Sequence, residues 1–105
     1  MKKVYLSGAI TNDKDAESKF DFYEKEFIKQ GNQVINPFAV CKSLKDFTHA
    51  EIMKVCFTLI DECEVVAFMP DWVCSLGSNQ EFGYAVAKGK MTYMIKSSDF
   101  LNYGE

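Results

Sequence analysis

The stretch Val65-Val-Ala-Phe-Met-Pro-Asp-Trp-Val-Cys-Ser-Leu-Gly-Ser-Asn-Gln-Glu81 gives the clearest indication of the fold. Its first five residues form an uninterrupted apolar run, which is typical of a strand covered on both faces. Pro70 ends that run, and we expect a helix from Ser78 to Lys88 that stops at Gly89. A strand, a loop and a helix in this order place backbone N–H groups at the carboxyl edge of a sheet, where open α/β proteins bind ligands.

The rest of the chain repeats the same alternation of strand and helix. We expect short strands at 3–7, 33–37 and 91–95, helices at 15–30 and 49–63, and a loop at 38–48, with Asn12 or Asp13 as the cap of the first helix. Such alternation implies right-handed crossovers between parallel strands. We therefore predict one α/β domain over residues 1–105, a three-layer sandwich with about four parallel strands, flavodoxin-like or Rossmann-like.

Composition excludes several classes of partner. The formal charge is −3, and the twelve basic residues are all Lys and are scattered along the chain, so we expect no binding to duplex nucleic acid. Without Arg, an anion must be bound by backbone N–H groups, hydroxyls or Lys. No apolar segment approaches the length of a membrane span, and no signal peptide is apparent, so we expect a cytoplasmic protein.

The motifs of common cofactor and metal sites are missing. The four cysteines show no C-x-x-C spacing and there is one His, so no metal site is predicted. Neither a G-x-G-x-x-G fingerprint nor a P-loop occurs, and we predict no cofactor.

Glu81 has two interpretations from the residue pattern. Ser78-Asn-Gln-Glu81 fits the capping box, in which the Glu bonds the N-cap amide, and the pattern alone favours this interpretation. Ser75 would then be a loop hydroxyl, Trp72 a packed aromatic residue at a strand end, and Gly77 a turn residue with positive φ. The alternative is a carboxylate in a ligand site.

Three motifs together resemble the nucleoside 2-deoxyribosyltransferase-like superfamily, above all its small phage and bacterial members. They are Tyr5-Leu-Ser-Gly-Ala-Ile10, Val34-Ile-Asn-Pro37 and Pro70-x-Trp-x-x-Ser75-x-Gly77-x-x-x-Glu81, and the similarity runs from Lys3 to Ile95. The resemblance implies that Glu81 attacks C1′ of a deoxyribose and that Tyr5 orients it. A carboxylate suits this role because glycosidic cleavage passes through an oxocarbenium-like state.

The resemblance also implies a ligand and an assembly. Relatives that act on nucleoside monophosphates carry a serine six residues before the glutamate, and Ser75 occupies that position. A hydroxyl beside a helix N-terminus accepts a 5′-phosphate that a carboxylate would repel. The implied substrate contacts are Gly8, Ile10, Asn36, Trp72, Ser75, Gly77 and Ser78. A homo-oligomer is implied as well, in which Asn102 and Tyr103 of the tail are candidates to reach a partner's pocket.

One position departs from the family pattern. The second acid of the family falls on Cys56 here, and a thiol of ordinary pKa is mostly protonated at neutral pH. Asp61 and Asp71 are weak substitutes, and Cys41, Cys63 and Cys74 are predicted to be structural. Two alternatives to a nucleotide N-glycosidase or transferase therefore stay open: a catalytically impaired nucleotide-binding protein, and a relative of the Toll/interleukin-receptor-type NAD-cleaving domains.

Overall fold

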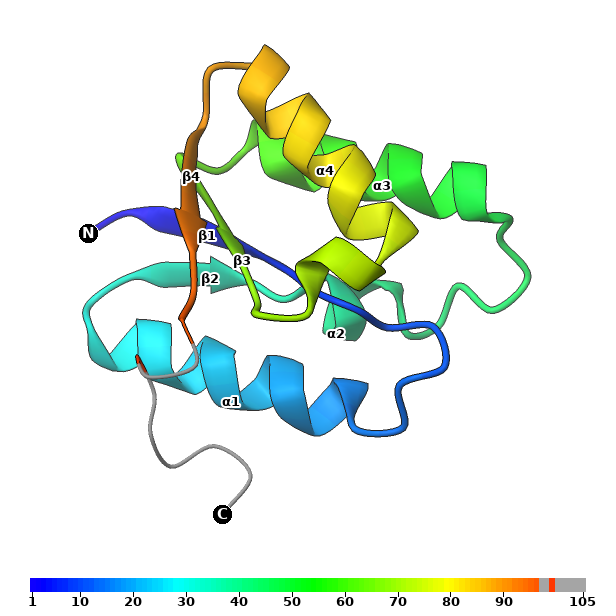
Figure 1. Ribbon diagram of the computed structural model, residues 1–105, viewed down its shortest axis with the longest axis horizontal. Coiled ribbons are helices and arrows are strands. Elements are labelled where there is room, and N and C mark those ends of the chain that lie inside the picture. Colours follow the sequence, from blue (N-terminus) through cyan, green and yellow to red (C-terminus); the bar gives the residue numbers. More distant parts are fainter. Residues whose placement is uncertain (97–98, 100–105) are drawn as a thin grey trace.

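The chain forms a four-stranded, all-parallel sheet in the order β2-β1-β3-β4. The computed structural model describes residues 1–96 and 99, and the tail residues Asn102 and Tyr103 lie outside the described part (Figure 1). The strands are β1 (Lys3–Ser7), β2 (Gln33–Ile35), β3 (Val65–Phe68) and β4 (Met91–Met94). The helices are α1 (Ala16–Lys29), α2 (Pro37–Cys41), α3 (His49–Asp61) and α4 (Leu76–Ala87), with a 3₁₀ turn, η1 (Trp72–Cys74).

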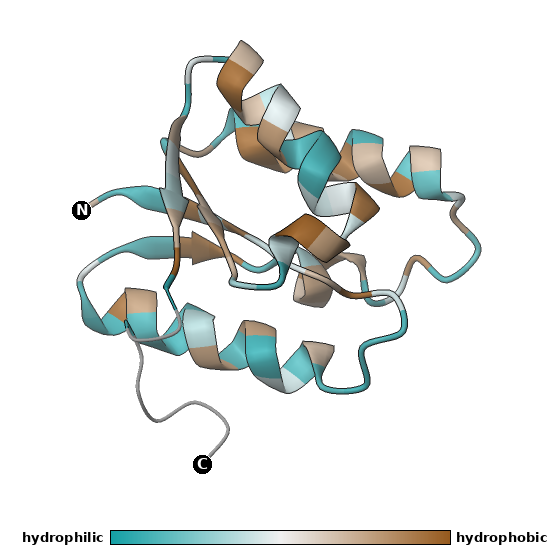
Figure 2. Cartoon of the chain, viewed as in Figure 1, coloured by the Kyte–Doolittle hydropathy of each residue, from teal (hydrophilic) through white to brown (hydrophobic). Residues whose placement is uncertain are grey.

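Helices cover both faces of the sheet, as predicted for a three-layer α/β sandwich. Alternate strand residues belong to two separate apolar clusters because successive side chains of a strand point to opposite faces. Val4 and Leu6 pack with the α1 residues Phe20 and Phe27, whereas Tyr5 packs with residues of α3 and α4. The central strands are apolar while most loops are hydrophilic, and α1 lies on the opposite side of the sheet from α3 and α4 (Figures 1 and 2).

Two helix starts differ from the predictions, both for reasons of capping. α2 occupies part of the predicted loop, because the Asn36 side chain accepts a hydrogen bond from Ala39 N (3.1 Å) and Pro37 is the first helical residue. α4 begins at Leu76, because Ser75 is its N-cap and Ser75 Oγ accepts from Ser78 N (3.1 Å). The capping box expected at Ser78 is therefore wrong.

Other local expectations also need correction. The N-cap of α1 is Asp15, which makes no side-chain cap bond, while Asn12 adopts a positive φ of 62° before the helix. Gly77 lies inside α4, and it does not have the positive φ expected of a turn residue. The capping box that does form joins Thr48 and Glu51 at the start of α3. Among residues 1–96 and 99, no helix is long and apolar enough to span a membrane.

Candidate functional site

A cavity of about 450 Å³ lies beyond the carboxyl ends of β1 and β3. The connection from β1 runs through α1 on one face of the sheet, and that from β3 runs through α4 on the other face. Helices that leave neighbouring strands on opposite faces open a crevice, and open α/β sheets bind ligands at this point. The volume lies within the range of roughly 300–1,000 Å³ that is usual for small-molecule sites.

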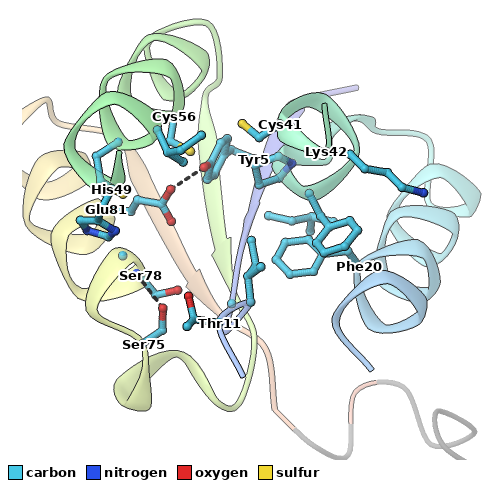
Figure 3. A pocket seen from close by; sticks show the side chains of 18 of the residues that line it. Tyr5, Thr11, Phe20, Cys41, Lys42, His49, Cys56, Ser75, Ser78 and Glu81 are labelled. Carbon is cyan, nitrogen blue, oxygen red and sulfur yellow. Dashed lines mark hydrogen bonds between the residues drawn. The ribbon is translucent and has the colours of Figure 1, made fainter. Parts of the chain in front are cut away.

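Glu81 projects from the second turn of α4 into this cavity and is 6% exposed. Both of its oxygens accept hydrogen bonds from β1: Tyr5 Oη donates to Oε2 (Figure 3), and Ser7 Oγ donates to Oε1 over 2.7 Å. Burial raises the pKa of Glu81, and the bonds from Tyr5, Ser7 and Cys56 and the charge of His49 oppose that rise. Glu81 is thus a buried carboxyl group held in place from the sheet, and it does not cap the helix.

Ser7 and Ser78 extend the polar network around Glu81. Their hydroxyl oxygens lie 2.9 Å apart, and both side chains are 1% exposed. Since Ser7 has a single hydroxyl proton, Ser78 is the donor of the pair whenever Ser7 donates to Glu81. Ser7 is absent from the sequence-based site, although it is two residues from Tyr5 and alternate strand residues share a face.

Cys56 faces the same network from α3. Its thiol lies within hydrogen-bonding reach of Tyr5, Glu81 and Cys41, and burial raises the pKa of Cys56 to about 12. The thiol is therefore protonated at neutral pH and carries no charge. Cys41, predicted to be structural, lines the cavity, whereas Cys74 is exposed and Cys63 is buried.

The predicted phosphate-binding residues gather at the first turn of α4. Ser75, Gly77 and Ser78 line the cavity there, and Thr11 from the loop after β1 lies close to Ser75 and Ser78 (Figure 3). His49 also lines this side, and its Nε2 is 2.9 Å from Gln80 Oε1. Neither Thr11 nor His49 was among the predicted site residues, because no local pattern marks a residue that only tertiary contacts bring to the cavity.

The remaining predicted contacts divide between the cavity and the framework. Gly8 and Ile10 line the cavity. The lining does not include Asn36, which caps α2 and donates to Glu24 Oε1 (3.0 Å), or Trp72, which packs on Phe68 and Phe82. Trp72 is therefore a packed aromatic residue, as the residue pattern alone indicated, and not a cavity residue.

The two aspartates considered as substitutes for the second acid have other partners. Asp61 accepts a hydrogen bond from Tyr84 Oη (2.6 Å) outside the cavity. Asp71 binds Lys19 and accepts from Ala9 N (3.3 Å). Among the residues that the structure describes, no three or more His, Cys, Asp or Glu side chains are grouped so as to hold a metal ion.

Comparison with known families places the chain. The model of the family described as "Domain of unknown function (DUF4406)" matches residues 2–94. The chain belongs to this family. A search of the curated proteins gave no match. The segment matched to DUF4406 runs from β1 to the end of β4, and every described residue that lines the cavity lies within it.

Proposed function

We propose that this DUF4406 protein is a nucleotide N-glycosidase, in which Glu81 attacks C1′ of a deoxynucleoside 5′-monophosphate. The observation that carries the proposal is the buried Glu81 carboxyl group, fixed through both oxygens by Tyr5 and Ser7 inside a cavity of ligand size. Such preorganisation suits a nucleophile because little reorganisation is needed when it attacks. The resemblance to the nucleoside 2-deoxyribosyltransferase-like superfamily supports the same assignment.

In the first step a Glu81 oxygen bonds to C1′ while the N-glycosidic bond breaks. The base leaves with the bonding electron pair and takes a proton from solvent. In the second step water adds to C1′, loses a proton and releases the Glu81 carboxylate, which yields deoxyribose 5-phosphate. A second base in place of water makes the reaction a transfer.

The 5′-phosphate is assigned to the start of α4. Ser75 Oγ accepts from Ser78 N, which leaves its hydroxyl proton free for a phosphate oxygen. The hydroxyl of Thr11 and the positive end of the α4 dipole favour an anion at the same place. No carboxylate other than Glu81 is among the described residues that line the cavity.

Base release from a panel of deoxynucleoside monophosphates, followed by chromatography, tests this function. Glu81→Gln is expected to reduce release by at least about a thousandfold, because an amide is not a nucleophile toward C1′. Glu64→Gln is the matched control, since Glu64 is exposed and contacts Lys3 N outside the cavity. Release that survives Glu81→Gln would contradict the assigned mechanism.

The protonated Cys56 thiol favours a second candidate, a nucleotide-binding protein without turnover. A neutral thiol supplies no negative charge opposite Glu81, where the related enzymes have an acid. This candidate predicts saturable binding by calorimetry with no base release, and base release after Cys56→Asp. Turnover by the unmodified protein would exclude it.

A further inference from the structure

The cavity has two chemically different halves. The half next to α4 carries the carboxyl, imidazole and hydroxyl groups, whereas the other half, here called the aromatic half, is built from α1, α2, the loop before α3 and the first turn of α3 (Figure 3). The aromatic half consists of six lining residues: Phe20, Pro37, Phe38, Cys41, Phe47 and Ile52. Phe20 and Phe38 stack within it, with ring centroids 6.0 Å apart.

Side chains in the aromatic half offer almost nothing that could pair with the edge of a base. No Asn, Gln or Asp is among the described lining residues, and Glu81, the one carboxylate, is engaged by Tyr5 and Ser7. Lys42 stands at the rim, where its Nζ is 2.6 Å from Glu17 Oε2. Cys41 contributes only a weak thiol donor.

The backbone of α2 is equally poor in free donors. Pro37 has no N–H group. The N–H groups of Ala39 and Val40 both donate to Asn36: Ala39 N to the Asn36 side chain (3.1 Å) and Val40 N to the Asn36 carbonyl (3.1 Å). The helix start that faces the aromatic half is therefore largely satisfied within the protein.

We propose that the aromatic half holds the base of the nucleotide by apolar contact alone, so that the protein selects substrates by the size and apolar surface of the base. This inference rests on the proposed function, which assigns the phosphate to Ser75 and the sugar to Glu81 and thereby leaves the aromatic half for the base. A site without hydrogen-bond partners does not recognise the polar edge of a ligand. Burying that edge unpaired also costs free energy, so less polar bases bind more tightly.

Three ligands of similar shape test the proposal: dUMP, dTMP, and the isostere of dTMP in which 2,4-difluorotoluene replaces thymine. The isostere keeps the shape of thymine without its hydrogen-bonding edge, and its carbon–carbon link to the sugar is not cleaved. Calorimetry on Glu81→Gln compares all three without turnover, and the isostere is also measured on the unmodified protein. We expect dTMP to bind about fourfold more tightly than dUMP, since one buried methyl group contributes that much. The isostere should bind at least as tightly as dTMP.

Variants locate the effect in the aromatic half. Phe47 is 45% exposed, so Phe47→Ala should leave the fold intact. Because Phe47 lines the aromatic half, the variant should bind all three ligands at least threefold more weakly. Val86→Ala is the control, because Val86 is 56% exposed and is not a lining residue. An isostere that binds ten times more weakly than dTMP would overturn the inference and leave the proposed function standing. Failure of all three ligands to bind would overturn both.

Discussion

Glu81, the proposed nucleophile, is a buried carboxyl group, and its protonation therefore depends on the fold. Because burial raises the pKa of Glu81 above its ordinary value of 4.5, the folded state binds this proton more tightly than the unfolded state does. The contribution of Glu81 to stability is therefore fully present below the unfolded pKa and is lost as pH rises through the folded pKa.

Glu81→Gln removes this titration and should change the pH dependence of stability. The free energy of unfolding of the variant minus that of the unmodified protein should increase as pH rises from about 4.5 through the raised pKa, and should then level off. Urea denaturation at a series of pH values measures this difference. A constant difference between pH 4 and pH 8 would show that the pKa of Glu81 is not raised.

Tyr5→Phe should be much more costly than the same change at Tyr84. The Tyr5 hydroxyl is buried and donates to the buried Glu81, so its loss should cost about 1.5–3 kcal/mol of stability. Tyr84 donates to the exposed Asp61, so Tyr84→Phe should cost clearly less stability than Tyr5→Phe. Thermal or urea unfolding of both variants provides the comparison, and equal losses would contradict the buried bond to Glu81.

Among single residues, those that stand in a motif were easier to predict from the sequence than those that only the tertiary structure brings together. Glu81, Ser75 and Tyr5 stand in recognisable motifs, and they line one cavity. Ser7 lies within the Tyr5-Leu-Ser-Gly-Ala-Ile10 motif but was not assigned a role there, and His49 stands in no motif. Asn36 lies in a motif too, but α2 uses its side chain as a cap, and capping and ligand binding require the same polar side chain.

Gly8 is required at the end of β1 by packing rather than by its own conformation. A Cβ at this position would lie 2.4 Å from Met69 Sδ and 3.1 Å from Met69 Cβ. Gly8→Ala should therefore destabilise the protein by about 1–3 kcal/mol, because the buried Met69 must move. Gly83→Ala is the control: a Cβ on Gly83 meets nothing within 4 Å, and in this helix it should stabilise by roughly 0.5–1 kcal/mol. Denaturant midpoints of both variants decide the matter, and a neutral Gly8→Ala would contradict the packing argument.

Ser75 caps α4 and is also the proposed phosphate ligand, and one substitution separates the two roles. Asp is as good an N-cap as Ser, so Ser75→Asp should change stability by less than about 0.5 kcal/mol. The added carboxylate should weaken the binding of nucleoside monophosphates at least tenfold, while the binding of the corresponding nucleosides should be almost unaffected. Calorimetry with each pair of ligands checks this prediction. Equal weakening of nucleoside and nucleotide binding would show that the phosphate does not contact Ser75.

At the scale of elements, helix starts were the least predictable feature. The S-x-x-E pattern at Ser78 lies one turn inside a helix that Ser75 already caps, and the sequence offers both serines as caps at once. Asn36-Pro37 fits the end of a strand and the beginning of a helix equally well, because proline suits both positions. The helices use Asn36 and Ser75 as caps, and a local pattern does not show which of several candidate caps a helix uses.

Lys19 links the two loops that border the cavity. Its Nζ donates to Ala9 O (2.9 Å) and Asp13 Oδ2 (2.6 Å) in the loop after β1 and to Asp71 after β3. Burial alone would lower the pKa of Lys19, but its hydrogen bonds and charge pairs with both aspartates outweigh burial and raise the pKa. Lys19 therefore fixes loops that are far apart in the sequence.

Lys19→Met should lower the free energy of unfolding of the whole molecule by about 1–3 kcal/mol. This loss lies between those typical of removing one partner of an exposed ion pair and of a buried ion pair. Lys25→Met is the matched control on the same helix, because the Lys25–Asp21 pair spans 3.6 Å and both side chains are more than half exposed. It should change stability by less than about 0.5 kcal/mol. Urea unfolding of both variants measures the difference, and equal effects would show that the link made by Lys19 is not needed.

At the scale of the whole molecule, the alternation of strands and helices was sufficient to predict the layers and the parallel sheet. Apolar runs and helical periodicity report burial on a sheet face directly, so β3 and α3 were expected close to their observed places. The link through Lys19 was not predictable, because Asp13, Lys19 and Asp71 are unremarkable charged residues until the fold brings them together.

A trapped glycosyl-enzyme would show whether Glu81 forms a covalent bond to the sugar. A fluorine at C2′ of a nucleoside 5′-monophosphate slows both steps, because it destabilises their oxocarbenium-like transition states. A base that leaves easily restores the rate of the first step only. The glycosyl-enzyme therefore accumulates. After incubation with such a compound, mass spectrometry should show an adduct of one fluorinated sugar phosphate on the peptide that contains Glu81, and none on Glu81→Gln. Saturable binding without an adduct, or an adduct on another residue, would contradict the assignment.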